Sequence, residues 1–148
     1  MKITYLKTPL NKYTFFIKPI RNWVEEHSLG KVLNLFAGKI KLNLDEFRVD
    51  ADKTMLADYY GDAYDFVKSC KSKFDTIILD PPYAYRKSME MYNGHKASRF
   101  NQLKDMIPKI LKKNGRVITF GYHSVSMGNA RGFKQEEILL MSHGGAIH

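Results

Sequence analysis

The sequence predicts an α/β domain of three layers, with a mainly parallel central sheet and helices on both of its faces. Apolar runs of four or five residues that favour β-strands alternate with stretches in which apolar residues recur at helical spacing. This alternation is typical of strand–helix–strand units, whose strands pair in parallel. The chain has 148 residues, 44% of them apolar, and shows no repeat or interdomain linker. We therefore expect a single domain over residues 1–148 with enough apolar side chains for a core.

The first helix and the first strand follow a short amino-terminal segment that carries a turn signal at residues 8–11. Apolar residues recur at helical spacing over residues 15–27, where Pro19 starts or kinks the helix. Residues 28–30 end this helix. Residues 31–35 then predict the first strand of the sheet.

This strand leads at once into Phe36-Ala37-Gly38. Small residues after a strand let a ligand approach the backbone closely, and backbone N–H groups there can bind a carboxylate. Residues 44–49 predict a second strand, with Asp50 at its carboxyl end. In a nucleotide-binding fold, an acid in that place accepts hydrogen bonds from ribose hydroxyls. Asp52 is a close alternative, and either acid could instead cap the next helix.

The stretch that organises the chain is a buried strand ending in an acid, two prolines and a tyrosine. It follows a predicted helix over residues 63–69, for which Asp62 has the N-cap position. Residues 76–79 form an apolar, β-branched run that suits the middle of a parallel sheet. The prolines that follow Asp80 cannot donate ladder hydrogen bonds, so the sheet must end there. In open α/β sheets, ligands bind at the carboxyl ends of the strands.

Four groups at this strand end fit a planar amine: the Asp80 carboxylate, the Pro81 carbonyl, the stiff backbone through Pro82 and the Tyr83 ring. The two acceptors can take both N–H bonds of an exocyclic amino group while the ring stacks on the base. Methylation of a nucleobase amine needs this arrangement, because the delocalised nitrogen lone pair must be turned toward a methyl donor. The alternative is an ordinary Pro-Pro turn with an aspartate cap.

Residues 84–99 mix aromatic and basic side chains without a clear period, and they predict a loop over the site. Aromatic rings can stack on bases, and basic groups can meet phosphates. A solvated surface loop is the alternative. The side chains suited to these contacts are Tyr85, Tyr92, Arg86, Lys87, Lys96 and Arg99.

The remaining chain predicts one helix and two strands. Apolar residues at helical spacing indicate a helix over residues 100–111, kinked at Pro108 and ended by the basic residues and glycine of 112–115. Residues 116–120 and 133–141 predict strands.

The segment Asp80-Pro81-Pro82-Tyr83 resembles the catalytic motif of the amino-methyltransferases, S-adenosylmethionine-dependent enzymes that methylate exocyclic amines of adenine, cytosine or guanine. The resemblance extends over residues 31–120 and implies a Rossmann-like class I methyltransferase fold. Asp rather than Asn at position 80 argues against the related protein-glutamine methyltransferases. The family's sheet ends in an antiparallel hairpin whose last strand would begin near residues 144–145. Either the given chain stops before that strand, or the strand is missing.

The resemblance also implies a pocket for S-adenosylmethionine. In the family, the turn after the first strand and the acids after the second and third strands hold this methyl donor. Phe36 would lie beside the sulfonium, where a ring face attracts a cation, or in the core. Residues 39–41, Lys-Ile-Lys, stand where the family usually has more glycines. The implied donor-binding residues are Asn34, Phe36, Ala37, Gly38, Asp50 and Asp62.

Charge and composition bound the partners and the compartment. The formal net charge is +9 and the pI is near 9.6, which suits a polyanion such as nucleic acid, although solubility is a plain alternative. The single cysteine, Cys70, excludes an internal disulfide and fits a reducing compartment. The histidines lack metal-site spacing, and no apolar run is long enough to cross a membrane. We expect a cytoplasmic protein without a metal.

The sequence therefore predicts an enzyme that transfers a methyl group from S-adenosylmethionine to a nucleobase amine, with N6 of adenine in DNA favoured. A ribosomal or transfer RNA base methyltransferase is one alternative, and a non-catalytic nucleic-acid-binding subunit of the same fold is another. The chain has no room for a separate recognition domain. Its sequence selectivity should be low or come from a separate specificity subunit, and a homodimer remains open.

Overall fold

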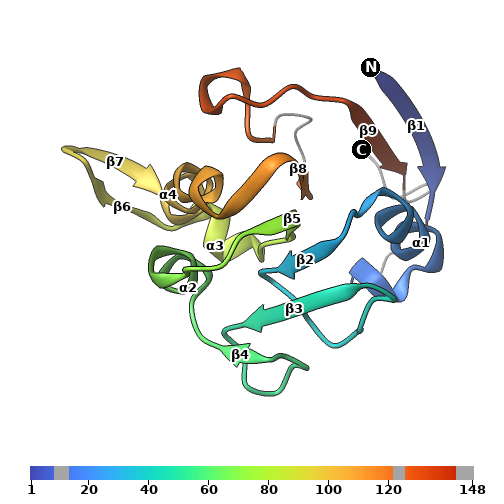
Figure 1. The fold of residues 1–148 in the computed structure, drawn as a ribbon, viewed down its shortest axis with the longest axis horizontal. Coiled ribbons are helices and arrows are strands. Elements are labelled where there is room, and N and C mark those ends of the chain that lie inside the picture. The colour runs from blue at the N-terminus through green and yellow to red at the C-terminus, as the bar shows by residue number, and fades with distance from the viewer. Residues whose placement is uncertain (9–13, 122–125, 143–148) are drawn as a thin grey trace.

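The centre of the protein is a sheet of five parallel strands. The computed structural model describes residues 1–8, 14–121 and 126–142. The strands lie side by side in the order β4-β3-β2-β5-β8 (Figure 1). This result confirms the predicted α/β fold with a mainly parallel sheet. The bounds are β2 (Lys31–Asn34), β3 (Asp45–Asp50), β4 (Tyr59–Tyr60), β5 (Phe74–Leu79) and β8 (Leu111–Thr119).

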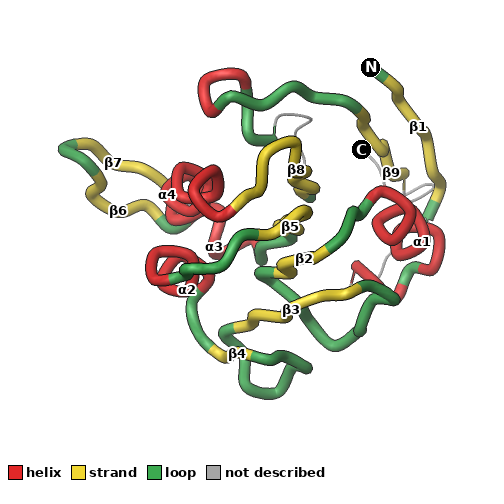
Figure 2. The backbone as a smooth tube through the Cα atoms, in the orientation of Figure 1, coloured by secondary structure: helices red, strands yellow, loops and turns green. Residues whose placement is uncertain are grey.

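Helices cover both faces of the sheet, as predicted (Figure 2). One face packs against α1 (Lys18–His27) and the short 3-10 helix η1 (Thr14–Phe16), through a core that includes Val24 and Ile78. The other face packs against α2 (Ala63–Ser69) and α4 (Arg99–Met106), through a core that includes Leu103 and Ile77. Successive strand residues point to opposite faces, so the adjacent Ile77 and Ile78 enter different cores. Both are fully buried, which explains the continuous apolar run in β5.

The ends of the described chain pair with each other outside the central sheet. Strand β1 (Lys2–Lys7) runs parallel to β9 (Glu137–Ser142), with Lys2 opposite Glu137. A contact of 2.6 Å between Nε2 of His27 and Oε2 of Glu137 links β9 to α1. The strand predicted over residues 133–141 therefore exists but begins at residue 137, and the sequence did not predict its partner β1. Residues 144–145, near which the last strand of the methyltransferase sheet would begin, lie outside the described residues.

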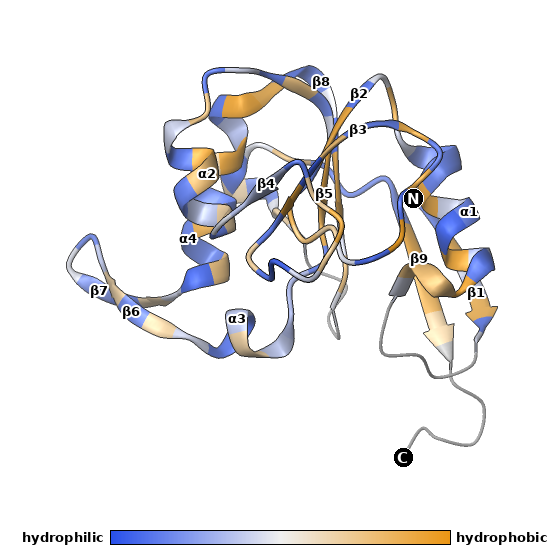
Figure 3. Ribbon diagram, turned by 90° about the horizontal axis from the view of Figure 1, so that it is seen from below, coloured by the Kyte–Doolittle hydropathy of each residue, from blue (hydrophilic) through white to orange (hydrophobic). Residues whose placement is uncertain are grey.

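The prediction of a loop over residues 84–99 is wrong. Residues Tyr83–Lys87 form the short helix α3, and β6 (Met89–Tyr92) pairs with β7 (His95–Ser98) as an antiparallel hairpin. The turn residues Asn93 and Gly94 have φ angles of 49° and 83°, the left-handed conformations that a tight Asn-Gly hairpin turn requires. Figure 3 shows the hairpin projecting from the body of the protein beyond α3.

The helix predicted over residues 100–111 is shorter than expected. Helix α4 ends at Met106, and the chain continues as the 3-10 helix η2 (Ile107–Ile110), because Pro108 lacks the N–H that an α-helix needs. Residues 112–115, predicted to end the helix, lie inside β8. Leu111 pairs with Phe74 and Arg116 pairs with Thr76, so the residues between Leu111 and Arg116 form a bulge.

Within the described ranges, none of the helices combines the length and the apolar composition that crossing a bilayer requires.

Candidate functional site

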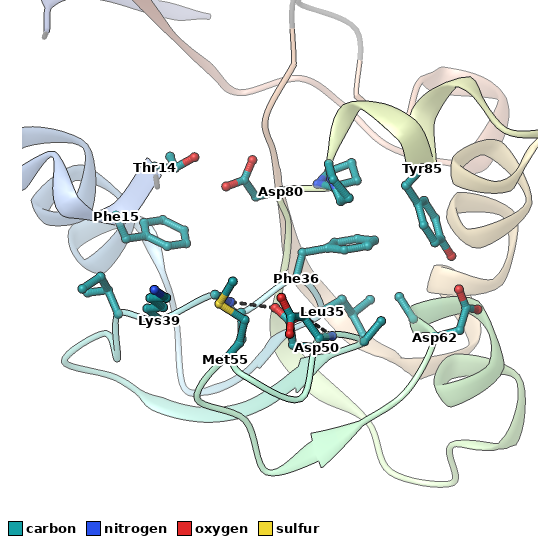
Figure 4. Close-up of a pocket in the computed structure, with 18 of the residues that line it drawn as sticks. Thr14, Phe15, Leu35, Phe36, Lys39, Asp50, Met55, Asp62, Asp80 and Tyr85 are labelled. Atoms are coloured by element: carbon teal, nitrogen blue, oxygen red, sulfur yellow. Dashed lines mark hydrogen bonds between the residues drawn. The ribbon is translucent and has the colours of Figure 1, made fainter. Parts of the chain in front are cut away.

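A cavity of about 410 Å³ opens at the carboxyl ends of the central strands. The sheet order reverses direction between β2 and β5, and open α/β sheets bind ligands at this point. Figure 4 shows side chains from several strand ends pointing into the cavity, with the Phe36 ring between Asp80 and Asp50. The structure brings together nine of the predicted site residues: Phe36, Ala37, Gly38, Asp50, Asp62, Asp80, Pro81, Pro82 and Tyr85.

Asp50 ties the turn after β2 to the end of β3. Its Oδ2 accepts a hydrogen bond from the Gly38 N–H (2.9 Å), and its Oδ1 accepts one from the Asp52 N–H (2.9 Å). Gly38 has a φ of 70°, and no atom lies within 4 Å of the place a Cβ would occupy. A carboxylate has about four acceptor positions, so about two remain on Asp50 for hydroxyl groups of a ligand.

Asp62 caps α2, as the sequence predicted, and also meets an arginine. Its Oδ2 accepts from the Asp65 N–H (3.0 Å) and from Nη2 of Arg99 (3.2 Å). The same Nη2 donates to Oδ1 of Asp65, and Nη1 of Arg99 donates to Oε2 of Glu90 in the hairpin. The guanidinium lies 4.2 Å from the centre of the Tyr64 ring. Arg99 therefore joins the cavity wall to the hairpin through bonds to three carboxylates, and its predicted contact with a phosphate stays a prediction.

Asp80 lies partly buried at the end of β5, beside Thr14. Burial raises the pKa of its carboxyl group, while a hydrogen bond with the Thr14 side chain and the positive charge of Arg86 act in the opposite direction. A carboxylate with a raised pKa is a better proton acceptor, as general bases often are. Arg86 itself donates from Nη2 to the Phe120 carbonyl (2.6 Å).

The raised pKa predicts that Asp80→Asn stabilises the fold at neutral pH. The folded protein holds the Asp80 proton more tightly than the unfolded chain does. Between the ordinary and the raised pKa, the folded state therefore binds more protons, and the free energy of unfolding falls as the pH rises. Asparagine removes this penalty. The melting temperature of Asp80→Asn minus that of wild type should increase with pH through this window and then level off. A pH-independent difference would contradict the prediction.

Two aromatic rings form part of the cavity wall. The rings of Phe36 and Tyr85 meet edge to face, with 5.1 Å between their centres. The Tyr85 hydroxyl accepts a hydrogen bond from the Tyr64 N–H (3.3 Å) and interacts with the Asp62 carboxylate. Burial, followed by the negative charge of Asp62, raises the pKa of Tyr85, so its hydroxyl stays protonated. The wall thus offers aromatic surface next to an acid, which suits a heterocyclic ring that carries an amino group.

Five predicted site residues do not line the cavity. Asn34 is fully buried, and its Nδ2 donates to Oε1 of Glu46 (3.2 Å). Tyr83 opens α3 and is 60% exposed, with Nζ of Lys87 5.3 Å from its ring centre. Lys87 ends the same helix α3 and, like Tyr83, does not line the cavity. The others that lie outside the lining are Arg86 and Tyr92.

Sequence reasoning missed Arg48, which organises the cavity wall from behind. Arg48 is 3% exposed and donates to the carbonyl groups of Ala37, Gly38, Ile40 and Leu56 at 2.8–3.0 Å. It also pairs with the buried Glu46 (3.0 Å). This one side chain fixes the turn after β2, which includes residues 39–41. In sequence, Glu46 and Arg48 alternate with apolar residues and read as the solvent face of a strand.

Thr14 and Phe15 also line the cavity and were not predicted to do so. They come from η1, far from the central strands in sequence, and no local pattern indicates the contact. In the described part of the chain, no three His, Cys, Asp or Glu side chains are placed to hold a metal ion.

No protein-family model matches the chain, and neither the curated proteins nor the solved structures give a significant match.

Proposed function

We propose that this protein is an S-adenosylmethionine-dependent methyltransferase that methylates the exocyclic amine of a nucleobase, with N6 of adenine in DNA favoured. The observation that carries the proposal is the position of Asp80-Pro81-Pro82. This segment ends the central strand β5 and lines the same cavity as Asp50 and Asp62, which follow other strands. Three segments far apart in sequence thus supply acceptors for one amine and one nucleoside-containing donor.

The sheet order supports a Rossmann-like class I methyltransferase fold. Numbered along the chain, the five central strands have the order 3-2-1-4-5, which is the order of the first five strands in doubly wound nucleotide-binding folds. The cavity of about 410 Å³ lies in the range of about 300–1,000 Å³ that is usual for small-molecule sites.

The residues at the cavity fit a methyl donor with a nucleoside and a sulfonium. Asp50 has acceptor positions left for ribose hydroxyls, and Asp62 can accept from an adenine amine. Phe36 presents a ring to a cation, and the open space at Gly38 admits the donor next to the backbone. When bound, S-adenosylmethionine supplies an electrophilic methyl group. The protein's own residues orient the target amine, stabilise the developing charge and accept the proton.

Asp80 and the Pro81 carbonyl hold the two N–H bonds of the target amine and turn its lone pair into the cavity. When the nitrogen takes the methyl group, the bond of that methyl to the donor sulfur would break and leave a neutral thioether. The nitrogen would become positive, and the Asp80 carboxylate would stabilise that charge. The proton that the nitrogen then releases passes to the same carboxylate, whose raised pKa makes it a suitable acceptor. If the target base lies in a duplex, it must first be flipped out, which costs a few kcal/mol.

The net charge of +9 supports a nucleic-acid substrate. The direct test is nucleoside mass spectrometry after the protein and isotope-labelled S-adenosylmethionine are incubated with unmethylated DNA or undermodified RNA. We expect labelled N6-methyladenine in DNA. Label found only in RNA would move the substrate to RNA. No label in either, with no binding of the donor by calorimetry, would refute the enzyme and leave a nucleic-acid-binding subunit.

A further inference from the structure

A second hollow, of about 600 Å³, lies between the hairpin strand β7, helix α4 and residues 126–131. We call it the basic groove. It shares no lining residue with the cavity at the strand ends. Its described lining carries three side chains with a full positive charge, Lys96, Lys104 and Arg131, against a single carboxylate, Asp105.

Lys104 is the buried centre of the basic groove. The residue is 9% exposed. Lysines are seldom buried to this extent unless they are paired with an opposite charge. Among the residues that the structure describes, the Lys104 ammonium donates one hydrogen bond, to the Ser126 carbonyl (3.2 Å), and it lies 4.7 Å from the Phe100 ring centre. An ammonium has three N–H donors, so this leaves two for a ligand. Burial and then the charge of Arg131 lower the pKa of Lys104, a cost that a bound anion would offset.

The neighbouring groups do not neutralise this charge. The lining carboxylate, Asp105, already accepts from Nε of Arg131 (2.8 Å), and Nη1 of Arg131 donates to the Met127 carbonyl (3.0 Å). The Ser126 hydroxyl is buried and has no hydrogen-bond partner in the part of the chain that the structure describes. A buried ammonium with spare donors next to an unpartnered hydroxyl and an exposed Lys96 matches the needs of an oxyanion with several acceptor oxygens.

We propose that the basic groove binds a backbone phosphate of the nucleic-acid strand whose target base enters the cavity. This inference rests on the proposed function. Tyr85 lines the cavity and Met89 lines the basic groove, and four residues span at most about 14 Å. At a rise of about 3.4 Å per nucleotide, a strand of about four stacked nucleotides covers that length. Met89 and residues 95–98 of the hairpin form part of the groove wall.

The test compares two variants that each lose two positive charges. Lys96→Gln/Lys104→Gln alters the basic groove. The control, Lys71→Gln/Lys73→Gln, alters exposed lysines that precede the amino end of β5 and line neither the groove nor the cavity. The probe is a fluorescein-labelled single DNA strand of about 12 nucleotides, and anisotropy measures its affinity over a range of salt concentrations. We expect the groove variant to bind about tenfold more weakly and the slope of log affinity against log salt to fall by about 0.7 to 1.4, one or two phosphate contacts.

Lys96→Gln alone keeps the test valid if the Lys104 substitution disturbs folding, because Lys96 is exposed. It should reduce the slope by up to about 0.7, while the melting temperature stays that of wild type. Equal losses in the groove and control variants would overturn the proposal.

Donor binding separates this failure from failure of the proposed function. Suppose that wild type binds S-adenosylmethionine and methylates the strand, but the groove variant keeps wild-type strand affinity. The groove proposal is then refuted and the proposed function is kept. Suppose instead that wild type binds the strand through the groove but neither binds the donor nor transfers methyl groups. The proposed function is then refuted, and the groove is still supported as a nucleic-acid-binding site.

Discussion

Asp80→Ala should lower the rate of methyl transfer about 10²–10³-fold and leave the affinity for S-adenosylmethionine within a few-fold of wild type. The loss has two physical sources. The amine loses the acceptor that orients its lone pair, and the positive charge that develops on nitrogen loses its nearest carboxylate. Donor binding is spared because the Asp50 and Asp62 carboxylates, on other segments, remain in place. Single-turnover transfer of labelled methyl groups measures the first effect, and calorimetry measures the second.

Asp75→Ala is the matched control on the same strand. Asp75 lies in the first part of β5, at the opposite end from Asp80, where its Oδ2 accepts from the Lys31 N–H (2.8 Å) and Nζ of Lys112 (3.3 Å). Its removal loosens the amino edge of the sheet but touches nothing at the cavity. Transfer per folded molecule should therefore match wild type. Unchanged transfer by Asp80→Ala, or equal losses in both variants, would remove the basis for assigning Asp80 to the chemistry.

Arg48→Met should destabilise the protein by about 3–5 kcal/mol, the cost of leaving one charge of a buried ion pair without its partner. Glu46, whose side chain is fully buried, would keep only its bonds with the Leu42 N–H and Asn34. Four carbonyl groups would lose their donor as well. At about 2–4 °C per kcal/mol for a domain of this size, the melting temperature should fall by about 6–20 °C. Thermal unfolding followed by circular dichroism measures the change.

Two further variants assign this loss to the buried pair. Arg116→Met removes an exposed arginine whose Nη1 donates to the His27 carbonyl (3.0 Å), and it should change the melting temperature little. Adding Glu46→Gln to Arg48→Met removes the stranded charge, so the double variant should be more stable than Arg48→Met alone. A single variant as stable as wild type would mean that the cavity wall does not depend on Arg48.

Local patterns in the sequence were sufficient for the central sheet and for the convergence of its strand ends. The apolar run before Asp80 and the cap at Asp62 each depend on residues that are close in sequence, and both predictions are confirmed. The Asn93-Gly94 turn was also a local signal, but the basic and aromatic side chains around it obscured the alternation of a hairpin. The basic residues before Gly115 resembled a helix end and instead form a bulge in a strand.

Other features depend on contacts that no local pattern records. The alternation of Glu46 and Arg48 with apolar residues is the same for a solvent face and for a buried pair, and the carbonyl groups that decide between them lie in two different loops. The approach of Thr14 to Asp80 joins segments about 66 residues apart. The hypothesis of methylation itself came from the four residues Asp80-Pro81-Pro82-Tyr83.

The pairing of β1 with β9 has a consequence for synthesis of the chain. Lys2 and Glu137 are 135 residues apart (137 minus 2), so β1 must wait for β9 to be synthesised before the two can pair. At about 5–20 residues per second, a ribosome leaves β1 without its partner for about 7–27 s. Contacts of such long separation form late and slowly. The central sheet can close during this interval, while an unpaired strand that carries Ile3 and Tyr5 is open to chaperones and to neighbouring chains.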